Sequence, residues 1–247
     1  MRLKDKTVII TGGGGEVGLA SAFQFLKEGA RVVLLDISDN ALDAAASSLQ
    51  EYQERVRTLK ADVRSLAEMA EAARFTVEAF GGIDILLTCA GIARHKPITQ
   101  MSFESWKEVL DVNMDGVFTA CKAVTPHMQR QHYGRIVHIS SICGRTGRPN
   151  VGVDYAASKA GVIGLTMMLS YELGPDNITV NAIAPAALKG HFNDAMPPEK
   201  VAKLVEGSRL GRMGNPVEVA YAAVYLASDE AAWITGEVLD MNGGLYY

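Results

Sequence analysis

The sequence predicts an α/β fold of Rossmann type, a doubly wound parallel sheet of about seven strands in a single domain spanning residues 1–247. Short apolar runs alternate with longer amphipathic runs from the first residues onward, which is typical of βαβ units. A glycine-rich stretch at 11–18 lies between the first apolar run and the first helical pattern. With 247 residues, 48% of them hydrophobic, the chain is long enough to bury the core of one such domain.

The strands are predicted from short runs of apolar and β-branched residues that are bounded by turn signals. A run of this kind without polar alternation is expected where helices cover both faces of a parallel sheet. The seven expected strands lie at 7–11, 31–36, within 56–61, 84–88, 134–140, 177–183 and 237–241.

The helices are predicted from amphipathic patterns and from start and stop signals. Ser38 is a favourable N-cap, and Pro216 follows a second N-cap at Asn215. The helix after the fifth strand is expected to end at Gly174, which a proline follows. Other helical patterns cover 19–27, 38–50, 65–80 and 102–131, and Pro126 predicts a break or kink in the last of these.

Residues 186–214 form the only long segment without a clear pattern. The segment contains Pro197 and Pro198 and several charged residues. Since a long irregular segment in a compact domain is either disordered or functional, we expect a substrate lid at about 186–214. The chain shows no repeat, low-complexity tract or linker, which favours one domain.

Composition and charge exclude several classes of protein. The net charge of −4 argues against a nucleic-acid partner, because binding to phosphate backbones requires a basic face. No apolar run reaches 18 residues, so no membrane span is expected, and the N-terminus lacks a secretory pattern, so we expect a cytoplasmic protein. The three cysteines have no metal-ligand spacing, and His127, His132 and His138 have no partner at ligand spacing. We therefore predict reduced thiols and no metal site.

The glycine-rich stretch, T-G-G-G-G-E-V-G at 11–18, has the position of a dinucleotide-binding turn. Glycines between a strand and a helix let the backbone approach a pyrophosphate, which then lies at the positive N-terminus of the helix. Asp36 ends the second expected strand, where an acid can accept hydrogen bonds from ribose hydroxyls. The alternative is a flexible turn followed by a strand-terminal aspartate that binds nothing.

Tyr155 and Lys159 form a candidate acid/base pair. In a helix their four-residue spacing places the phenol and the ammonium one turn apart on one face, where the cation favours the phenolate. A base that works near pH 7 needs the tyrosine pKa lowered by roughly three units, or about 4 kcal/mol. The alternative is a tyrosine and a lysine that only share a helix face.

The motifs taken together resemble the short-chain dehydrogenase/reductase family over nearly the whole chain. The resemblance is carried by the 11–18 stretch, by Asp62-Val63 after the third strand and by Cys89-Ala90-Gly91 after the fourth. It continues with Asn113, Ser141 and the Y-x-x-x-K motif of Tyr155 and Lys159. The stretches N-A-I-A-P at 181–185 and I-T-G at 234–236 and the N-G-G at 242–244 are most similar to the 3-oxoacyl-[acyl carrier protein] reductases of this family.

The resemblance implies a role for each of these residues in hydride transfer. Tyr155 would exchange a proton with the substrate oxygen, and Ser141 would hydrogen-bond the same oxygen. Lys159 would lower the tyrosine pKa and hold the nicotinamide ribose, and Asn113 would carry a water chain to the lysine. Ser140 is the alternative to Ser141. The implied cofactor-binding residues are Gly12, Gly14, Gly15, Val17, Gly18, Asp36, Asp62, Val63, Cys89, Ala90, Gly91, Tyr155, Lys159, Pro185 and Leu188.

The chain departs from the family pattern only on the cofactor side. Glu16 replaces the middle glycine of the fingerprint, and Cys89 replaces the asparagine before Ala-Gly. Ala186 replaces a glycine, and Gly190 replaces a threonine that contacts the cofactor. A carboxylate near a pyrophosphate is repelled by it, so we expect Glu16 to turn away from the phosphates and to weaken NAD(H) binding without preventing it.

The sequence therefore predicts an NAD(H)-dependent oxidoreductase that interconverts a secondary alcohol and a ketone. Asp36 favours NAD(H) over NADP(H), because its carboxylate repels a 2′-phosphate and no arginine follows it. The alternatives are a 3-oxoacyl-[acyl carrier protein] reductase and a catalytically silent relative with a binding role. An anionic substrate is suggested by five cationic groups near the expected pocket, Arg94, His95, Arg145, Arg148 and Lys189. The resemblance also implies a homotetramer.

Overall fold

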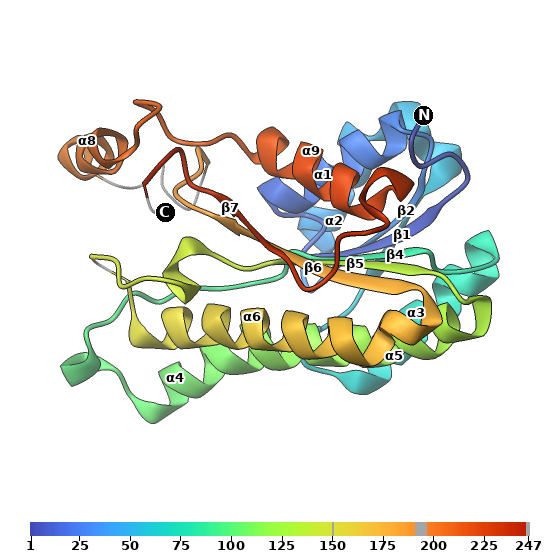
Figure 1. The fold of residues 1–247 in the computed structure, drawn as a ribbon, viewed down its shortest axis with the longest axis horizontal. Helices are drawn as coiled ribbons and strands as arrows, with labels where there is room; N and C mark the ends of the chain where they lie inside the picture. The colour runs from blue at the N-terminus through green and yellow to red at the C-terminus, as the bar shows by residue number, and fades with distance from the viewer. Residues whose placement is uncertain (150, 191–196, 246–247) are drawn as a thin grey trace.

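Seven parallel strands form the single sheet of the computed structural model, which describes residues 1–149, 151–190 and 197–245. The strand order is β3-β2-β1-β4-β5-β6-β7, so the chain starts near the middle and winds outward in both directions (Figure 1). The strand bounds are Thr7–Thr11 (β1), Arg31–Asp36 (β2), Val56–Lys60 (β3), Ile85–Thr88 (β4), Gly134–Ile139 (β5), Ile178–Pro185 (β6) and Val238–Met241 (β7). The predicted α/β fold is confirmed, and each strand end lies within about two residues of its expected position.

Helices cover both faces of the sheet. Three lie on one face: α1 (Glu16–Lys27), α2 (Asp39–Ser48) and α9 (Pro216–Ala227). The opposite face carries α3 (Leu66–Phe80), α4 (Phe103–Leu110), α5 (Gly116–Gln131) and α6 (Val153–Leu173), as Figure 1 shows. The helix α8 (Pro198–Gly207) stands away from the sheet, beyond the end of β7.

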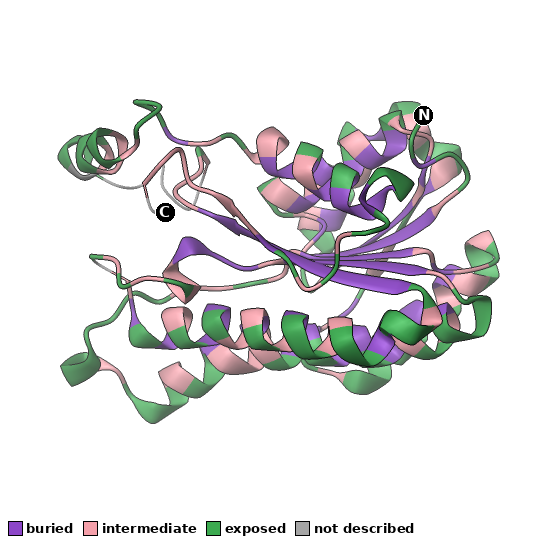
Figure 2. Ribbon diagram, viewed as in Figure 1, coloured by how far each residue is buried: buried purple, intermediate pink, exposed green. Residues whose placement is uncertain are grey.

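The two helical layers explain why the strands read as continuous apolar runs. In β1, Val8 and Ile10 pack into the core on the α1 side, whereas Ile9 packs into the core on the α3 side. All five residues of β1, all four of β4 and all eight of β6 are buried, which Figure 2 shows as the purple centre of the molecule. Polar side chains can reach solvent from these strands only at their ends.

The long helical segment after β4 differs from the prediction at one point. The chain stays helical through Pro126 within α5, and the irregularity lies instead at Asp111–Asp115, a π-helical turn between α4 and α5. Gly116 at the end of this turn is pressed against Val63, because a Cβ built there would come within 2.6 Å of Val63 Cγ2. The π turn places the side chain of Asn113 in the interior, where it is fully buried.

The other predicted helix signals are found with small shifts. The Ser38 side chain accepts a hydrogen bond from Ala41 N–H at the start of α2, but α2 ends at Ser48, and a 3₁₀ helix follows. The helix α6 ends at Leu173, directly before Gly174 and a proline that cannot continue it. At α9, Asn215 and Glu218 form a capping box.

The segment predicted as a lid, 186–214, contains α8 and has both of its ends joined. The Lys189 amide donates to Gly214 O at 2.9 Å, and the Gly214 amide donates to Ala187 O at 3.0 Å. The chain therefore leaves and re-enters the domain at one place. Residues 191–196 of this segment lie outside the described residues, and its role as a lid stays a prediction.

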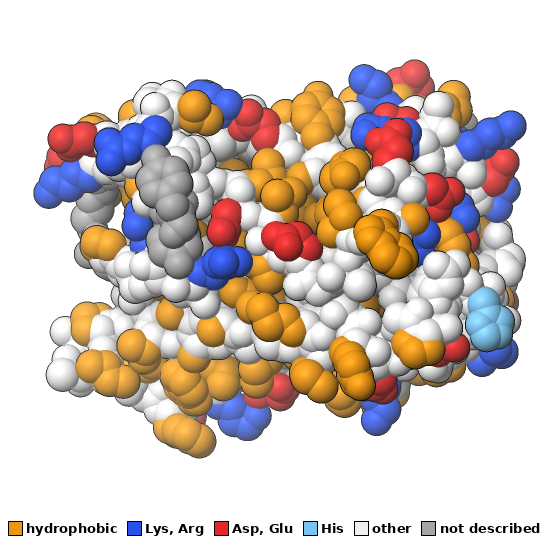
Figure 3. Space-filling view, viewed as in Figure 1, with side chains coloured by type: hydrophobic (Ala, Val, Ile, Leu, Met, Phe, Trp, Pro, Cys, Tyr) orange, Lys and Arg blue, Asp and Glu red, His pale blue; other side chains and the backbone are white. Residues whose placement is uncertain are grey.

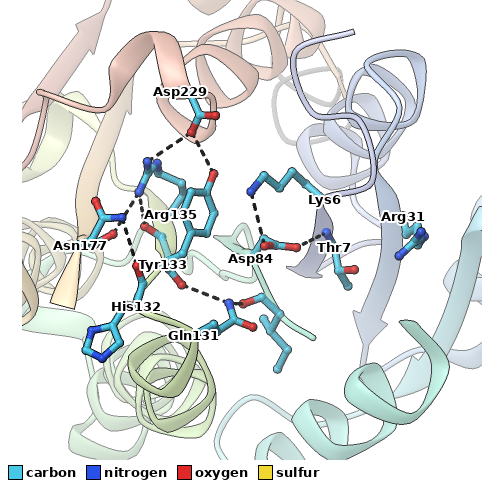
Figure 4. Close-up of polar contacts among 12 residues, drawn as sticks. Lys6, Thr7, Arg31, Asp84, Gln131, His132, Tyr133, Arg135, Asn177 and Asp229 are labelled. Carbon is cyan, nitrogen blue, oxygen red and sulfur yellow. Dashed lines mark hydrogen bonds and ion pairs between the residues drawn. The ribbon is translucent and has the colours of Figure 1, made fainter. Parts of the chain in front are cut away.

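The N-terminal ends of the central strands are held by a polar network (Figure 4). Arg135, only 2% exposed, lies 3.4 Å from Asp229 and donates to Gly134 O and Asn177 O. Its guanidinium and the Lys6 ammonium lie 4.3 and 3.6 Å from the centroid of the Tyr133 ring. These contacts join the starts of β1, β5 and β6, although Arg135 Nε is buried without a hydrogen-bond partner among the described residues.

The described residues include no helix that is long and apolar enough to cross a membrane. Within the same part of the chain, no group of three or more His, Cys, Asp or Glu side chains is placed to hold a metal ion. Cys89, Cys121 and Cys143 are free thiols.

His138 is the one histidine that is fully buried among the described residues, and it lies in β5. Its Nδ1 is 3.0 Å from Thr88 Oγ1, and its Nε2 is 3.8 Å from Cys121 Sγ. Burial lowers the pKa of His138 from 6.5 to about 3, and the charge of Lys159 acts in the same direction. The imidazole is therefore neutral in the folded chain at pH values where the unfolded chain is protonated.

This difference predicts acid destabilisation through His138. Between pH 6.5 and about 3 the unfolded chain binds a proton that the folded chain does not, so stability falls with falling pH by up to about 1.4 kcal/mol per pH unit. Urea unfolding of wild type and His138→Gln across this range should show the stability difference shrinking as pH falls. The control is His132→Asn, at an exposed left-handed residue where asparagine is tolerated. A difference that is constant with pH would contradict the assignment.

Candidate active site

A cleft of about 230 Å³ lies at the C-terminal edge of the sheet, where the turns after β1, β4, β5 and β6 meet the start of α6. The edge is the one at which ligands bind in open α/β sheets. Of the residues that the sequence predicted for the site, those lining the cleft are Gly12, Gly15, Val17, Gly18, Cys89, Gly91, Ser141, Tyr155, Lys159, Pro185 and Leu188. A larger cavity of about 440 Å³ under α8 shares Ala186 and Leu188 with it but contains none of the catalytic candidates.

The glycine-rich turn is shaped by close contacts that only glycine permits. Gly12 has φ +63°, and a Cβ built on it would come within 2.7 Å of the Ala90 backbone. A Cβ on Gly18 would overlap the carbonyl oxygen of Gly12. Gly15 is exposed at the N-cap of α1, with no side chain capping the helix. The start of α1 therefore lies at the cleft without a side-chain cap at Gly15, where a phosphate could bind.

Asp36 lies at the end of β2 and is tied to the same turn. Its Oδ2 accepts a hydrogen bond from Gly14 N–H at 3.1 Å, and its Oδ1 accepts one from Ser38 N–H at 3.1 Å. Each carboxylate oxygen has a second acceptor position left. Asp36 thus fixes the turn and can still accept hydrogen bonds from a ribose, although neither it nor Gly14 lines the cleft described above.

Four other predicted residues also lie outside the cleft lining, Asn113 and the cofactor-binding candidates Asp62, Val63 and Ala90. The Asp62 carboxylate is 2.5 Å from Arg64, and hydrogen bonds from that guanidinium hold the pKa of Asp62 below its usual range. The carbonyl of Val63, a buried residue, accepts a hydrogen bond from Thr119. Ala90 packs against Gly12. The roles of Asp62, Val63 and Ala90 in cofactor binding stay predictions.

Asn113 joins the turn after β4 to α6. Its Oδ1 accepts from Ile92 N–H at 2.8 Å, and its Nδ2 donates to Ile92 O at 2.9 Å and to Ser158 Oγ at 3.1 Å. A Cβ built on Gly91 would lie 3.3 Å from Asn113 Oδ1 and 3.6 Å from Lys159 Nζ, which places the asparagine next to the lysine. Asn113 is thus a positioning residue in this structure.

The two neighbouring serines after β5 have different surroundings. Ser140 donates to the carbonyl of Lys159 at 2.9 Å and is bound to β6 through its amide, so its hydroxyl is used within the fold. Ser141 accepts from Cys143 N–H at 3.1 Å and hydrogen-bonds the Tyr155 phenol. The structure therefore places Ser141, as the resemblance implied, beside Tyr155.

Tyr155 and Lys159 lie on one face of α6, with Lys159 Nζ 5.7 Å from the Tyr155 ring centroid. Burial raises the pKa of Tyr155 to about 12, a nearby Cys143 adds to this, and the hydrogen bond from Ser141 opposes it. Burial lowers the pKa of Lys159 to about 8. In the chain alone the Lys159 ammonium donates to Ile139 O at 2.8 Å, and the expectation that Lys159 lowers the tyrosine pKa when a cofactor is bound stays a prediction.

Cys89, which stands where the family pattern has an asparagine, lies near Lys159. Burial raises the pKa of its thiol to about 12, and the charge of Lys159 acts against that rise. The thiol is therefore neutral, and it lines the cleft as an apolar group. The substitution makes this wall of the cleft less polar without adding a charge.

Several residues of the cleft had no signal in the sequence. Ile139 and Pro216 line it, and Pro216 comes from the distant helix α9, which no local pattern relates to the site. The His95 ring packs edge-on against Tyr155, with centroids 5.9 Å apart. Burial lowers the pKa of His95, while the charge of Asp154 acts against that shift.

Comparison with known proteins agrees with this geometry over the whole chain. The family model described as enoyl-(acyl carrier protein) reductase matches residues 15–246. The chain is 38% identical over 245 residues to the 3-oxoacyl-[acyl-carrier-protein] reductase FabG of Thermotoga maritima, with 99% of both chains covered. The chain belongs to the short-chain dehydrogenase/reductase family. As a short-chain dehydrogenase/reductase, it is an oxidoreductase.

Two solved short-chain dehydrogenase/reductase structures show the same fold. NAD⁺-bound xylitol dehydrogenase superposes with a TM-score of 0.94 at 30% identity, covering 99% of this chain and 100% of that one. Levodione reductase superposes with a TM-score of 0.93 at 31% identity, covering 98% of each. A nicotinamide cofactor is therefore expected, and the Gly12 contact with Ala90, the open start of α1 and the carboxylate of Asp36 fit it.

If Tyr155 exchanges a proton with the substrate in this short-chain dehydrogenase/reductase, Tyr155→Phe should lose turnover but keep cofactor binding. The change deletes only the phenolic hydroxyl, so turnover should fall to less than about a tenth of wild type while the dissociation constant of NADH changes by less than about twofold. Tyr171→Phe, on the exposed side of the same helix, is the matched control. Turnover is measured from the absorbance at 340 nm. A Tyr155→Phe turnover above about a tenth of wild type would refute the role of Tyr155 in proton transfer.

Proposed function

We propose that the protein is an NAD(H)-dependent oxidoreductase that interconverts a secondary alcohol and a ketone. The observation that carries the proposal is the meeting of Ser141, Tyr155 and Lys159 at one end of a cleft whose other wall is the glycine-rich turn. A panel of ketones and secondary alcohols, assayed at 340 nm with each cofactor, tests it. Failure of wild type to bind NADH at millimolar concentration would favour a catalytically silent relative.

The proposed chemistry assigns one task to each side chain. A bound nicotinamide supplies the hydride for the carbonyl carbon in reduction. With a pKa of about 12, Tyr155 keeps its proton at neutral pH and can donate it to the carbonyl oxygen. Ser141, hydrogen-bonded to Tyr155, can position the same oxygen. Lys159, with a pKa of about 8, supplies a buried positive charge that stabilises the phenolate left after proton transfer.

Asp36 supports the preference for NAD(H). Its carboxylate is fixed at the end of β2 by two backbone amides, and the residues that follow, Ile37 and Ser38, bring no cation to offset repulsion of a 2′-phosphate. Lys60 lies beside the end of β2, but its ammonium is paired with Asp39 at 2.5 Å. These charges support NAD(H) as the cofactor.

Asp36→Ala should therefore relax cofactor choice. We expect the ratio of kcat/KM with NADH to kcat/KM with NADPH to fall at least about tenfold, because a charged hydrogen-bond acceptor and a repulsive charge are removed together. We use the ratio of the two kcat/KM values, because any loosening of the contact between Asp36 and Gly14 affects both cofactors. Asp39→Ala, an exposed acid three residues away, is the control, and an unchanged ratio in Asp36→Ala would contradict the assignment.

An anionic substrate is a further part of the proposal. It is supported by fewer cationic groups than the five that the sequence suggested. Arg94 is paired with Glu108 at 2.6 Å, and Arg145 lies 3.5 Å from Asp240, so their charges are offset. Lys189 lines the cleft, and His95 contacts Tyr155. The support rests on Lys189, because burial lowers the pKa of His95 and leaves its ring neutral at pH 7, and Arg148 does not line the cleft.

A carboxylated ketone should be reduced with higher kcat/KM than its neutral ester, by at least about tenfold for a desolvated charged contact worth about 1.5 kcal/mol. Lys189→Met should remove most of the difference, and Lys203→Met on the outer helix α8 should not. Equal efficiency on the acid and the ester would exclude a charged recognition site.

A second candidate function is reduction of a 3-oxoacyl group carried by acyl carrier protein. The name of the full-length Thermotoga maritima relative supports it. Against it, Tyr171 stands where the family resemblance leads us to expect a carrier-binding arginine, and Arg130 is engaged with His127 at 2.9 Å. Higher kcat/KM on a 3-oxoacyl carrier with NADPH than on small ketones with NADH would favour this candidate.

A homotetramer is proposed from two exposed apolar patches. One lies over α4, α5 and α6, where orange side chains gather along the lower edge of Figure 3, and the other lies around α9. The first patch contains Phe103, Phe118, Met167, Met168 and Tyr171, which are 49–83% exposed. The second contains Tyr221, Tyr225 and the fully exposed Trp233. Patches of this kind on a single chain support contacts with other copies.

Light scattering on wild type should give four times the chain mass of 26.5 kDa. Met168→Glu and Trp233→Glu should each give dimers, because each places a charge in one of the two patches. Leu66→Glu, at an exposed apolar residue outside both patches, should stay tetrameric. A monomeric wild type at micromolar concentration would rule out the assembly.

A further inference from the structure

Glu16, which lines the cleft, and Gly190 come from distant parts of the chain and lie against each other. A Cβ built on Gly190 would overlap Oε1, Oε2 and Cδ of Glu16. The carboxylate of Glu16 therefore fills the space that a side chain at residue 190 would use. Gly190 also has φ +131°, a backbone conformation that glycine adopts most readily.

This contact holds the carboxylate against the segment that follows β6. Glu16 is in the first turn of α1, with the glycine-rich turn on its N-terminal side, and Gly190 follows β6. Glu16 lines the same cleft of about 230 Å³ as Tyr155 and Lys159. Glu16 thus places a negative charge in the wall of one small cleft, which is lined both by the start of α1, where a pyrophosphate is expected, and by Tyr155 and Lys159.

The charge acts differently on the two redox states of a nicotinamide cofactor. The pyrophosphate is anionic in both states, so a carboxylate repels both. The ring is positive only when oxidised, so the same carboxylate attracts the ring of NAD⁺ and not that of NADH. The carboxylate therefore weakens the binding of NAD⁺ less than it weakens the binding of NADH.

We propose that Glu16, held against Gly190, is a specificity residue that favours binding of NAD⁺ relative to NADH and so favours alcohol oxidation. The inference rests on the proposed function as a nicotinamide-dependent enzyme. Lys189 also lines the cleft, on the same segment as Gly190, and Lys159 lies at the catalytic end. Both are cations that act on the oxidised ring in the opposite sense, so the effect of Glu16 is measured as a difference between variants.

The first experiment measures the dissociation constants of NAD⁺ and NADH by calorimetry for wild type and Glu16→Gln. The variant keeps the size of the side chain and removes its charge. We expect NADH to bind about fivefold more tightly in Glu16→Gln and NAD⁺ to change by less than about twofold, the size expected of one partly screened charge. Glu16→Gly should also tighten NADH. The shift should shrink in 0.5 M salt, and Glu51→Gln, an exposed charge change outside the cleft, should produce none.

The second experiment moves the carboxylate without changing Glu16. Because the carboxylate ends a flexible side chain, Gly190→Ala should displace it and alter the ratio of the two dissociation constants. The same change in the Glu16→Gly background should leave the ratio unaltered, because no carboxylate remains to be moved. An equal effect of Gly190→Ala in both backgrounds would show that backbone strain alone is responsible and would refute the contact.

The outcomes separate this inference from the proposed function. If wild type binds both cofactors and Glu16→Gln changes both dissociation constants equally or not at all, Glu16 has no redox preference and the inference is wrong while the proposed function stands. If wild type binds neither cofactor, the proposed function fails and the inference fails with it.

Discussion

Burial of the sheet on both faces is the constraint on which the rest of the structure depends. The central strands have no solvent-facing side, so they accept almost only apolar side chains, and polar groups gather at the strand ends. The two ends are used differently. At the N-terminal edge, Arg135, Tyr133, Lys6 and their partners contact one another, whereas the C-terminal edge keeps an open cleft with catalytic candidates around it.

The same burial sets the charge state of the site. Lys159 is 5% exposed and holds its ammonium on one backbone carbonyl, and burial lowers its pKa to about 8. Tyr155 is shifted in the opposite direction, to about 12. Both shifts favour the neutral forms, as desolvation requires. A positive group brought into the cleft would act against the shift of Tyr155, so the phenol of the chain alone suits proton donation better than proton abstraction.

The fold could be predicted almost completely from the sequence, because apolar runs such as Thr7–Thr11 and caps such as Asn215 act locally. The irregularity before α5 could not be predicted from the sequence. Pro126 was a visible signal but is accommodated within α5, whereas the π turn at Asp111–Asp115 accompanies two tertiary contacts, Gly116 against Val63 and Asn113 against Ile92. The sequence shows where a proline stands, but it does not show which neighbour a helix will pack against.

The site shows the same division between local and tertiary information. Short motifs mark the glycine-rich turn, Ser141, Tyr155 and Lys159, whereas the place of Pro216 in the cleft and the contact of His95 with Tyr155 depend on the packing of separate segments. Glu16 and Gly190 are the clearest case. In the sequence they are two unrelated departures from a family pattern, 174 residues apart. In the structure they are one contact, since the side chain gained at residue 16 takes the space left by the side chain absent at residue 190. Two departures that compensate in space indicate a rebuilt cofactor wall, and such a wall argues for a retained cofactor site more than for a decayed one.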